Sequence, residues 1–266
     1  MPSANSGSKK IKAIKIFKDH VTLSFAKGEP LKISKEAFVS SYLYAGKSLT
    51  NKEIAKLEEI TAMTVLLNHA LSIVSKKHLS EKEMLEKLLK KENNYQVAKN
   101  VIAKLKENDL LDDKAFMYDL VEWDNERCFG QNKIIKHLRD KGIPEPIIKK
   151  ASFSASLEKK KAKLLLPKLE KKYDRFGYIS KKQHVYNALV SQGYTIDVAK
   201  EVIEEVKKGN DKKEIELLKK DYEKAKNRYA RKYEGYQLKQ KVYSYLVSKG
   251  YKYQDIKKVL DVEDYE

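Results

Sequence analysis

The feature that most constrains the fold of this chain is an internal repeat. The ten residues 185–194 and the ten residues 242–251 are identical at seven positions, at a constant offset of 57. A third copy spans 135–143, and a more degenerate copy spans 84–89. Such periodicity predicts a stack of similar units, because one small helical unit cannot bury all its apolar faces alone.

Each copy has the pattern of an amphipathic helix that ends at a residue able to adopt the left-handed conformation. Gly142, Gly193 and Gly250 hold that position in three copies, and Asn93-Asn94 lies near it in the first. Glycine reaches positive φ without steric cost, and asparagine is the next most tolerant. An apolar residue follows each glycine and is expected to begin a short helix. Each unit is therefore predicted to contain a long helix, a middle helix, a turn and a short helix.

The predicted fold class is mostly α: tandem three-helix repeats form an elongated curved array, preceded by a small N-terminal module that contains β-strands. With only 10 Gly and 5 Pro in 266 residues, long irregular segments are disfavoured. The predicted boundaries are a flexible tail at 1–10, a β-rich module with one helix at 11–50, a connecting helix at 51–60, and three-helix repeats at 61–111, 112–153, 154–209 and 210–266.

The N-terminal module is predicted from short apolar runs. Val21–Phe25 alternates between apolar and polar residues, Ile11–Phe17 is partly alternating, and Leu31–Ile33 follows a turn that contains Gly and Pro. Two or three antiparallel strands are expected, followed by a helix at 35–43.

The helices beyond this module carry start and stop signals. Capping boxes, in which one side chain accepts a backbone N–H and another reaches back, are predicted to begin at Thr50, Ser80, Ser180 and, in a looser form, Asp211. Pro167 lies where the long helix of the third repeat is expected, and it should kink that helix or delay its start.

One stripe is especially regular and decides the role of several aromatic residues. Its members recur at steps of three and four and are Ile215, Leu218, Tyr222, Ala225 and Tyr229. A stripe with this spacing lies on one face of a helix, and we interpret it as core rather than as a base-stacking platform. Lys220, Lys224 and Arg231 lie on the opposite face.

The charge of the chain indicates a polyanionic partner. The net charge is +18, and residues 153–266 hold 28 of the 56 basic residues but only 18 of the 38 acidic ones, a net +10. Nucleic acid is the leading partner class, because neutralising phosphates releases counterions. An anionic membrane surface and a lysine-rich solvated surface remain open alternatives.

No catalytic or metal-binding constellation is found, so an enzyme is not expected. The five histidines are scattered without metal-ligand spacing, and we interpret Asp112-Asp113 as a helix cap rather than a metal site. No catalytic, cofactor-binding or metal-binding residue is predicted.

Cysteine usage and hydropathy bear on the compartment. The single cysteine, Cys128, cannot form a disulfide within the chain, fits a reducing cytoplasm and is expected to be inert. No uninterrupted apolar run approaches the roughly 18 residues of a membrane span, so no membrane association through a span is expected.

Several segments together resemble the RecX family. They are residues 70–85, residues 101–116 with the step Leu111-Asp112-Asp113, the segment Arg127-Cys128-Phe129-Gly130, and Leu138 to Gly142. The resemblance covers roughly residues 60–266, and the β extension is similar to that of longer Gram-positive members. The chain departs from the family where lysine replaces arginine and where the first repeat lacks a Lys-Gly turn.

The resemblance implies a regulator of RecA. RecX-like proteins bind the RecA filament on single-stranded DNA and modulate its ATPase and strand exchange, so inhibition in DNA repair and the SOS response is the expectation here. A cytoplasmic monomer without a cofactor, which contacts single-stranded or also duplex DNA through phosphates, is expected.

The candidate contact residues are basic residues near the repeat junctions, each of which could equally be an ordinary solvated side chain. They are Arg127, Lys133, Lys136, Lys141, Arg175, Lys181, Lys182, Arg228, Arg231, Lys232 and Lys239. Two other readings remain open: a direct DNA-binding protein of the helix-turn-helix kind, and a helical-repeat scaffold for protein partners.

Overall fold

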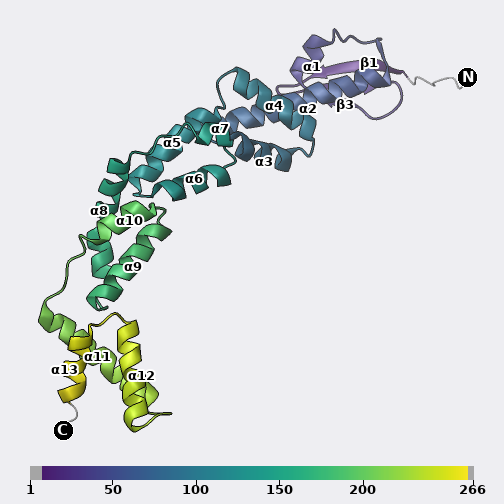
Figure 1. Ribbon diagram of the computed structural model, residues 1–266. Helices are drawn as coiled ribbons and strands as arrows, with labels where there is room; N and C mark the ends of the chain where they lie inside the picture. Colours follow the sequence, from purple (N-terminus) through teal and green to yellow (C-terminus); the bar gives the residue numbers. More distant parts are fainter. Residues whose placement is uncertain (1–7, 263–266) are drawn as a thin grey trace, which may run out of the picture. The chain divides into compact units, whose positions relative to one another are not determined.

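The computed structural model describes residues 8–262 and is mostly helical with a small N-terminal antiparallel sheet, which confirms the predicted mostly α class with a β-containing N-terminal module (Figure 1). The chain forms two compact units. The first comprises the residues up to Tyr118 together with Arg139–Ile148, and the second comprises Asp119–Leu138 and the residues from Lys149 onward.

The sheet of the first unit has four strands in the order β3-β2-β1-β4, with every neighbouring pair antiparallel. The strands are β1 (Lys9–Ile16), β2 (Val21–Phe25), β3 (Leu31–Ile33) and β4 (Ser48–Leu49). The alternation predicted for β2 is observed, since Val21, Leu23 and Phe25 are buried. Strand β4 was not predicted, because two residues are too few to show a period.

The predicted tail and first helix both differ from the structure. Lys9 and Lys10 belong to β1 and pair with β4, so only residues 1–7 of the expected tail lie outside the described residues. Helix α1 (Lys35–Ser40) ends earlier than expected, and Tyr42 follows it at a φ of 46°. Positive φ is unfavourable in a helix of L-residues, which ends the helix there.

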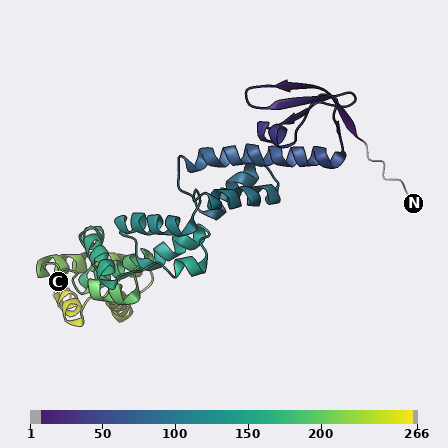
Figure 2. The ribbon, with the colours of Figure 1, turned by 90° about the horizontal axis from the view of Figure 1, so that it is seen from above.

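Helix α2 (Asn51–Val74) is one continuous helix that joins the sheet to the first repeat. The predicted connecting helix and the first helix of the repeat are therefore a single element, since no Gly or Pro interrupts it. Leu57 packs in the core under the sheet, whereas Leu66 and Ala70 pack in the core formed with α3 (Glu81–Lys91) and α4 (Tyr95–Glu107). Figures 1 and 2 show α2 running from the sheet alongside α3 and α4.

The hydropathy of α2 bears on the expectation that the chain contains no membrane span. Among the described residues, α2 is the one helix long and apolar enough to cross a membrane by length and composition. Counting apolar runs missed it because polar residues, namely Thr61, Thr64, Asn68 and His69, interrupt the apolar stretch. The two halves of α2 pack into the two cores of the first unit, while Val65 and Leu71 are exposed.

The remaining helices follow one another in groups of three. They are α5 (Asp113–Glu126), α6 (Gln131–Asp140), α7 (Glu145–Ile148), α8 (Ala155–Lys172), α9 (Tyr178–Ser191), α10 (Ile196–Ile203), α11 (Asp211–Tyr229), α12 (Gly235–Ser248) and α13 (Tyr253–Val262). Gly142, Gly193 and Gly250 have φ values of 79°, 91° and 83°, as predicted. The first repeat differs, because Asn94 is not left-handed and instead caps the start of α4.

Two of the four predicted capping boxes are present. Those of Thr50 and Ser80 are present in full, and Asp112 accepts the Lys114 backbone N–H at 2.7 Å as a helix cap. Ser180 is not a cap, because α9 begins two residues earlier, after Gly177. Asp211 is likewise the first residue of α11, and Asn210 caps it.

Two further expectations concern the interior of helices. Pro167 lies inside α8, which begins at Ala155, so the proline does not delay the helix start. In α11 the middle of the predicted stripe is core, since Leu218, Tyr222 and Ala225 are buried, whereas Tyr229 is half-buried and Ile215 is 44% exposed.

A carboxylate from each following repeat caps the middle helix of the repeat before it. The first backbone N–H of α3 donates to Asp113 at 2.8 Å, that of α6 to Glu158 at 2.9 Å, and that of α9 to Glu214 at 2.7 Å. Each acceptor lies in the first turn of the next long helix. The capped N–H groups have no partner inside their own helix, so the carboxylates satisfy them and complement the helix dipole.

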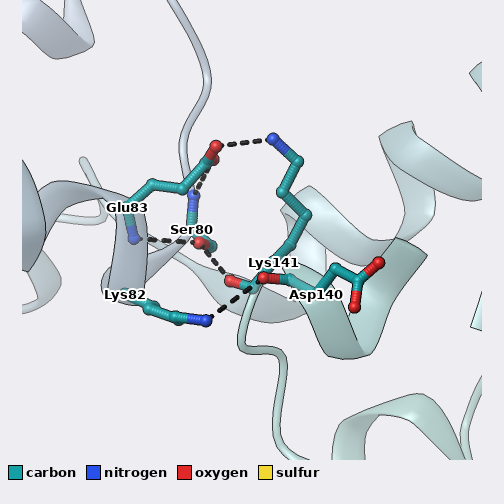
Figure 3. Close-up of polar contacts among 5 residues, drawn as sticks. All are labelled: Ser80, Lys82, Glu83, Asp140 and Lys141. Atoms are coloured by element: carbon teal, nitrogen blue, oxygen red, sulfur yellow. Dashed lines mark hydrogen bonds and ion pairs between the residues drawn. The ribbon is translucent and has the colours of Figure 1, made fainter. Parts of the chain in front are cut away.

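The glycine turns add further contacts where one repeat meets the next, a place that we call a joint. Figure 3 shows the first joint, where the Ser80 hydroxyl donates to the Lys141 carbonyl at 2.6 Å and the Lys141 ammonium pairs with Glu83 at 2.5 Å. At the second joint, the Asn132 N–H donates to the Gly193 carbonyl at 2.9 Å. The same glycines that end the middle helices therefore also dock against the preceding repeat, which explains why this position recurs.

Replacing Asp113 with alanine is expected to cost about 1 kcal/mol of unfolding free energy, and replacing it with asparagine about 0.3 kcal/mol, because asparagine can still accept the Glu81 N–H. Burial raises the pKa of the Asp113 carboxyl above its ordinary value of 3.8, against the opposing effect of that hydrogen bond. The folded state therefore binds this proton more tightly, and the free energy of unfolding should fall as pH rises from 3.8 through the raised pKa.

The asparagine variant should lack that fall in stability with pH. Urea unfolding of both variants across acidic to neutral pH measures the effect. Equal losses for alanine and asparagine at neutral pH would show that Asp113 does not act as a cap.

Candidate nucleic-acid interface

The loop before α6 brings two of the candidate cations onto the same ring. The Arg127 guanidinium lies 4.7 Å and the Lys133 ammonium 3.7 Å from the centre of the Phe129 ring. Arg127 also lies 4.4 Å from the ring of Trp123, whose side chain is 53% exposed. The result is a cation–aromatic layer, a term used here for Trp123, Arg127, Phe129 and Lys133.

Local structure positions this layer. Trp123 lies near the end of α5, and Cys128 adopts a φ of 55°, which turns the chain toward α6. The Tyr194 hydroxyl donates to the Cys128 carbonyl at 2.7 Å, and burial raises the pKa of Tyr194, so the hydroxyl stays protonated. The turn that presents Phe129 is thereby held by the following repeat.

The loop before α9 repeats the arrangement. The Arg175 guanidinium lies 5.0 Å from the ring of Phe176, and Arg175 is exposed. In the last repeat, exposed Arg228 lies 5.6 Å from the ring of Tyr229. Cations held on aromatic faces are of the kind that contacts phosphates while the rings stack bases.

Other candidates are engaged inside the fold. Lys181 is only 8% exposed and lies 4.0 Å from Glu170 and 3.8 Å from Asp174. Lys141 pairs with Glu83 in the first unit, and the Lys182 ammonium lies 2.8 Å from Glu204. These three charges serve folding contacts, which weakens the case for them as partner contacts.

The remaining candidates lie on the surface but are not gathered into one cluster. Lys136, Arg231, Lys232 and Lys239 are exposed. The structure therefore unites Arg127 with Lys133, places Arg175 and Arg228 on aromatic rings, and leaves the others dispersed.

Sequence reasoning missed the aromatic partners of these cations. Trp123, Phe129 and Phe176 were not among the candidate contact residues, although a recurring motif could have identified Phe129 and Phe176. Arg127-Cys128-Phe129-Gly130 and Arg175-Phe176-Gly177 both place an arginine just before Phe-Gly at the start of a middle helix. That recurrence marks a loop rather than a helix face, so it does not follow the helical period.

The described residues contain no group of three or more His, Cys, Asp or Glu side chains that could hold a metal ion. Among them, the buried Asp124 carboxylate contacts the His137 ring nitrogen Nδ1 at 2.7 Å. His137 also lies edge-on to Phe129, with ring centres 5.6 Å apart. The Asp124–His137 pair therefore packs against Phe129, one ring of the cation–aromatic layer.

Tandem three-helix groups joined through carboxylate caps and glycine turns define a helical-repeat protein, and its exposed cation–aromatic loops suit a polyanionic partner. A family model described as the third three-helix domain of RecX matches residues 212–260, which is the group α11–α13. The regulatory protein RecX of Streptococcus pyogenes serotype M4 is 28% identical over 234 residues, which cover 86% of this chain and 89% of that protein.

A second relative, the regulatory protein RecX of Streptococcus agalactiae serotype Ia, is 26% identical over 254 residues, 94% of this chain and 98% of that protein. A crystal structure of a regulatory protein RecX shares the fold with a TM-score of 0.63 at 23% identity, over 74% of this chain and all of that one. The crystal structure of RecX from Lactobacillus salivarius matches 55% of this chain and 96% of that one, at 25% identity and a TM-score of 0.51. The chain is therefore similar to RecX proteins over most of its length, and its last helix group matches the family model.

Proposed function

We propose that this protein binds the filament that RecA forms on single-stranded DNA and lowers the filament's ATPase and recombinase activity, in DNA repair and the SOS response. Similarity over most of the chain to proteins named regulatory protein RecX carries the proposal. The net charge of +18 and the exposed cation–aromatic loops support a nucleoprotein partner. We further propose that the protein acts as a cytoplasmic monomer without a cofactor.

The contact set that the geometry favours is smaller than the one drawn from sequence. It retains the exposed or ring-stacked cations and leaves out Lys141, Lys181 and Lys182. Its members are Arg127, Lys133, Lys136, Arg175, Arg228, Arg231, Lys232 and Lys239.

The ATPase of the cognate RecA on single-stranded DNA is expected to fall when this protein is added at substoichiometric ratios, and filaments should shorten. The triple variant Arg228→Ala, Arg231→Ala, Lys232→Ala should need roughly ten-fold more protein for the same effect, since each phosphate contact contributes a salt-dependent part of the affinity. A matched control with the same change in charge is Lys52→Ala, Lys56→Ala, Lys87→Ala, whose side chains are exposed in the first unit.

The outcomes separate the competing functions. No change in ATPase or filament length, with folded protein and active RecA, would sink the proposal. Sequence-specific binding to a duplex without RecA would then favour the direct DNA-binding protein. Absence of any binding to DNA or filament would favour the protein scaffold.

A further inference from the structure

A cavity of about 390 Å³ opens between the last two helix groups of the second unit. One wall is the Arg175-Phe176 loop, a second is a face of α11, and the third is the end of α12 with Tyr245 and Lys249. The α11 residues in the wall are Leu217, Lys220, Asp221 and Lys224, which follow the three-and-four spacing of one helix face. This volume is within the range of small-ligand sites. We call it the cationic pocket.

The charge around this pocket is strongly unbalanced. Four cations line it, namely Arg175, Lys220, Lys224 and Lys249, against the one carboxylate of Asp221. Within residues 8–262, none of the four forms an ion pair. Nearby lysines of the same unit are paired, as Lys213 is with Asp174. Clustered like charges with no internal counter-ion repel one another and attract an anion into the concavity.

The one carboxylate of the pocket is itself engaged by the core. The Tyr251 hydroxyl donates to Asp221 at 2.9 Å. Burial, and after it this hydrogen bond, raises the pKa of Tyr251, so the hydroxyl stays protonated and keeps donating. Asp221 therefore has a structural partner, and the pocket retains four cations against this one carboxylate.

The pocket also offers two aromatic faces. Phe176 and Tyr245 are half-buried, and each carries a cation: Arg175 lies 5.0 Å from the Phe176 ring and Lys249 lies 5.3 Å from the Tyr245 ring. Lysines beside aromatic rings provide both parts of a nucleotide contact, a charge for the phosphate and a surface for the base. A simple anion site would not need the rings.

We propose that the cationic pocket binds one phosphate and the adjoining base of a single strand of nucleic acid. This proposal adds to the proposed function a direct contact between this chain and the single strand. It rests on the proposed function only for the identity of that strand. A free nucleotide and a strand both carry phosphate, so the experiment distinguishes binding of one from binding of the other.

The test measures binding of the full chain to fluorescent oligothymidine by anisotropy, without RecA. The variant Lys220→Ala, Lys224→Ala should weaken binding about ten-fold and reduce the slope of log affinity against log salt by about 1.4, because each lysine that neutralises a single-strand phosphate contributes roughly 0.7 to that slope. The control variant Lys219→Ala, Lys257→Ala removes the same charge at exposed positions outside the pocket, and it should weaken binding less than about two-fold.

A second variant tests the stacking part. Phe176→Leu keeps an apolar side chain but removes the ring, and it should weaken binding of oligothymidine at least about five-fold, as expected for one base stack. Its binding of an abasic strand of equal length should be unchanged.

Three results would overturn the proposal. Equal weakening by the lysine variant and its control would assign the effect to net charge alone. Equal effects of Phe176→Leu on both strands would remove the base contact. Displacement of the strand by thymidine monophosphate at matching affinity would assign the pocket to a free nucleotide. Because RecA is absent, failure here is read separately from failure of the ATPase experiment.

Discussion

Lys161→Ala is expected to destabilise the second unit by about 3–5 kcal/mol, because it leaves a buried carboxylate without its cation. Lys161 and Glu158 are each only 3% exposed, and their charged atoms lie 2.5 Å apart. The Lys161 ammonium also donates to the Asn125 side chain and to the Phe129 carbonyl, both at 2.7 Å. The variant therefore also leaves two partly buried acceptors without this donor.

The same change should disturb the cation–aromatic layer. Asn125, in the last turn of α5, and Phe129 flank the turn that presents Arg127, so loss of the Lys161 hydrogen bonds should loosen this turn. Trp123 is the single tryptophan of the chain and lies against Arg127. Tryptophan fluorescence followed during denaturant unfolding therefore reports the stability and the local change together.

A more exposed ion pair, which also uses a lysine of α8, provides the control. Lys163 and Glu205 are also 2.5 Å apart, but their side chains are 44% and 47% exposed. Lys163→Ala should cost less than about 1 kcal/mol, as exposed ion pairs do. The double variant Glu158→Gln, Lys161→Met should recover about 2 kcal/mol relative to the sum of the single variants, because it removes both buried charges. Equal losses for Lys161→Ala and Lys163→Ala would contradict the interpretation.

Gly193→Ala is expected to cost about 3 kcal/mol, from a backbone strain and a clash together. Gly193 has a φ of 91°, which L-residues rarely adopt, and an added Cβ would lie 2.4 Å from the Lys133 backbone nitrogen. That nitrogen belongs to helix α6 and cannot move independently. The substitution should therefore separate the second joint and displace Lys133 from the Phe129 ring.

Gly235→Ala separates the strain from the clash. Gly235 also has a positive φ, of 53°, but nothing lies within 4 Å of its added Cβ. It should cost only about 1 kcal/mol, the strain alone. Hydrogen exchange of the Asn132 amide, which donates to Gly193, locates the effect at the joint. Similar losses at the two glycines would mean that docking against the preceding repeat contributes nothing.

Much of the fold was predictable because its signals are local. The alternation of Val21–Phe25 and the caps at Thr50 and Ser80 each depend on a few neighbouring residues. The cap predicted at Ser180 failed because α9 takes its cap from Glu214, 36 positions away. No local pattern can show such a partner, since a satisfied N–H requires only that some acceptor be present.

The sequence indicated the kind of candidate site but not which residues belong to it. The positive charge of the C-terminal half indicated a polyanion, and three of the candidates chosen from sequence, Arg127, Lys133 and Arg175, lie on aromatic rings in the structure. Lys181 and Lys220 have the same side chain and similar neighbours in sequence, yet one is buried beside carboxylates and the other lines an unbalanced pocket. Their difference depends on which distant helix each one faces.

The sequence by itself determined that this protein is a chain of three-helix repeats after a small sheet, with glycines at the turns and an excess of positive charge. Periodicity, capping and backbone freedom act over a few residues, so they can be read along the chain. Only the tertiary structure decided which charges are neutralised at the joints and which remain for a partner. Those pairings join residues dozens of positions apart, and packing between helices brings them within reach of one another.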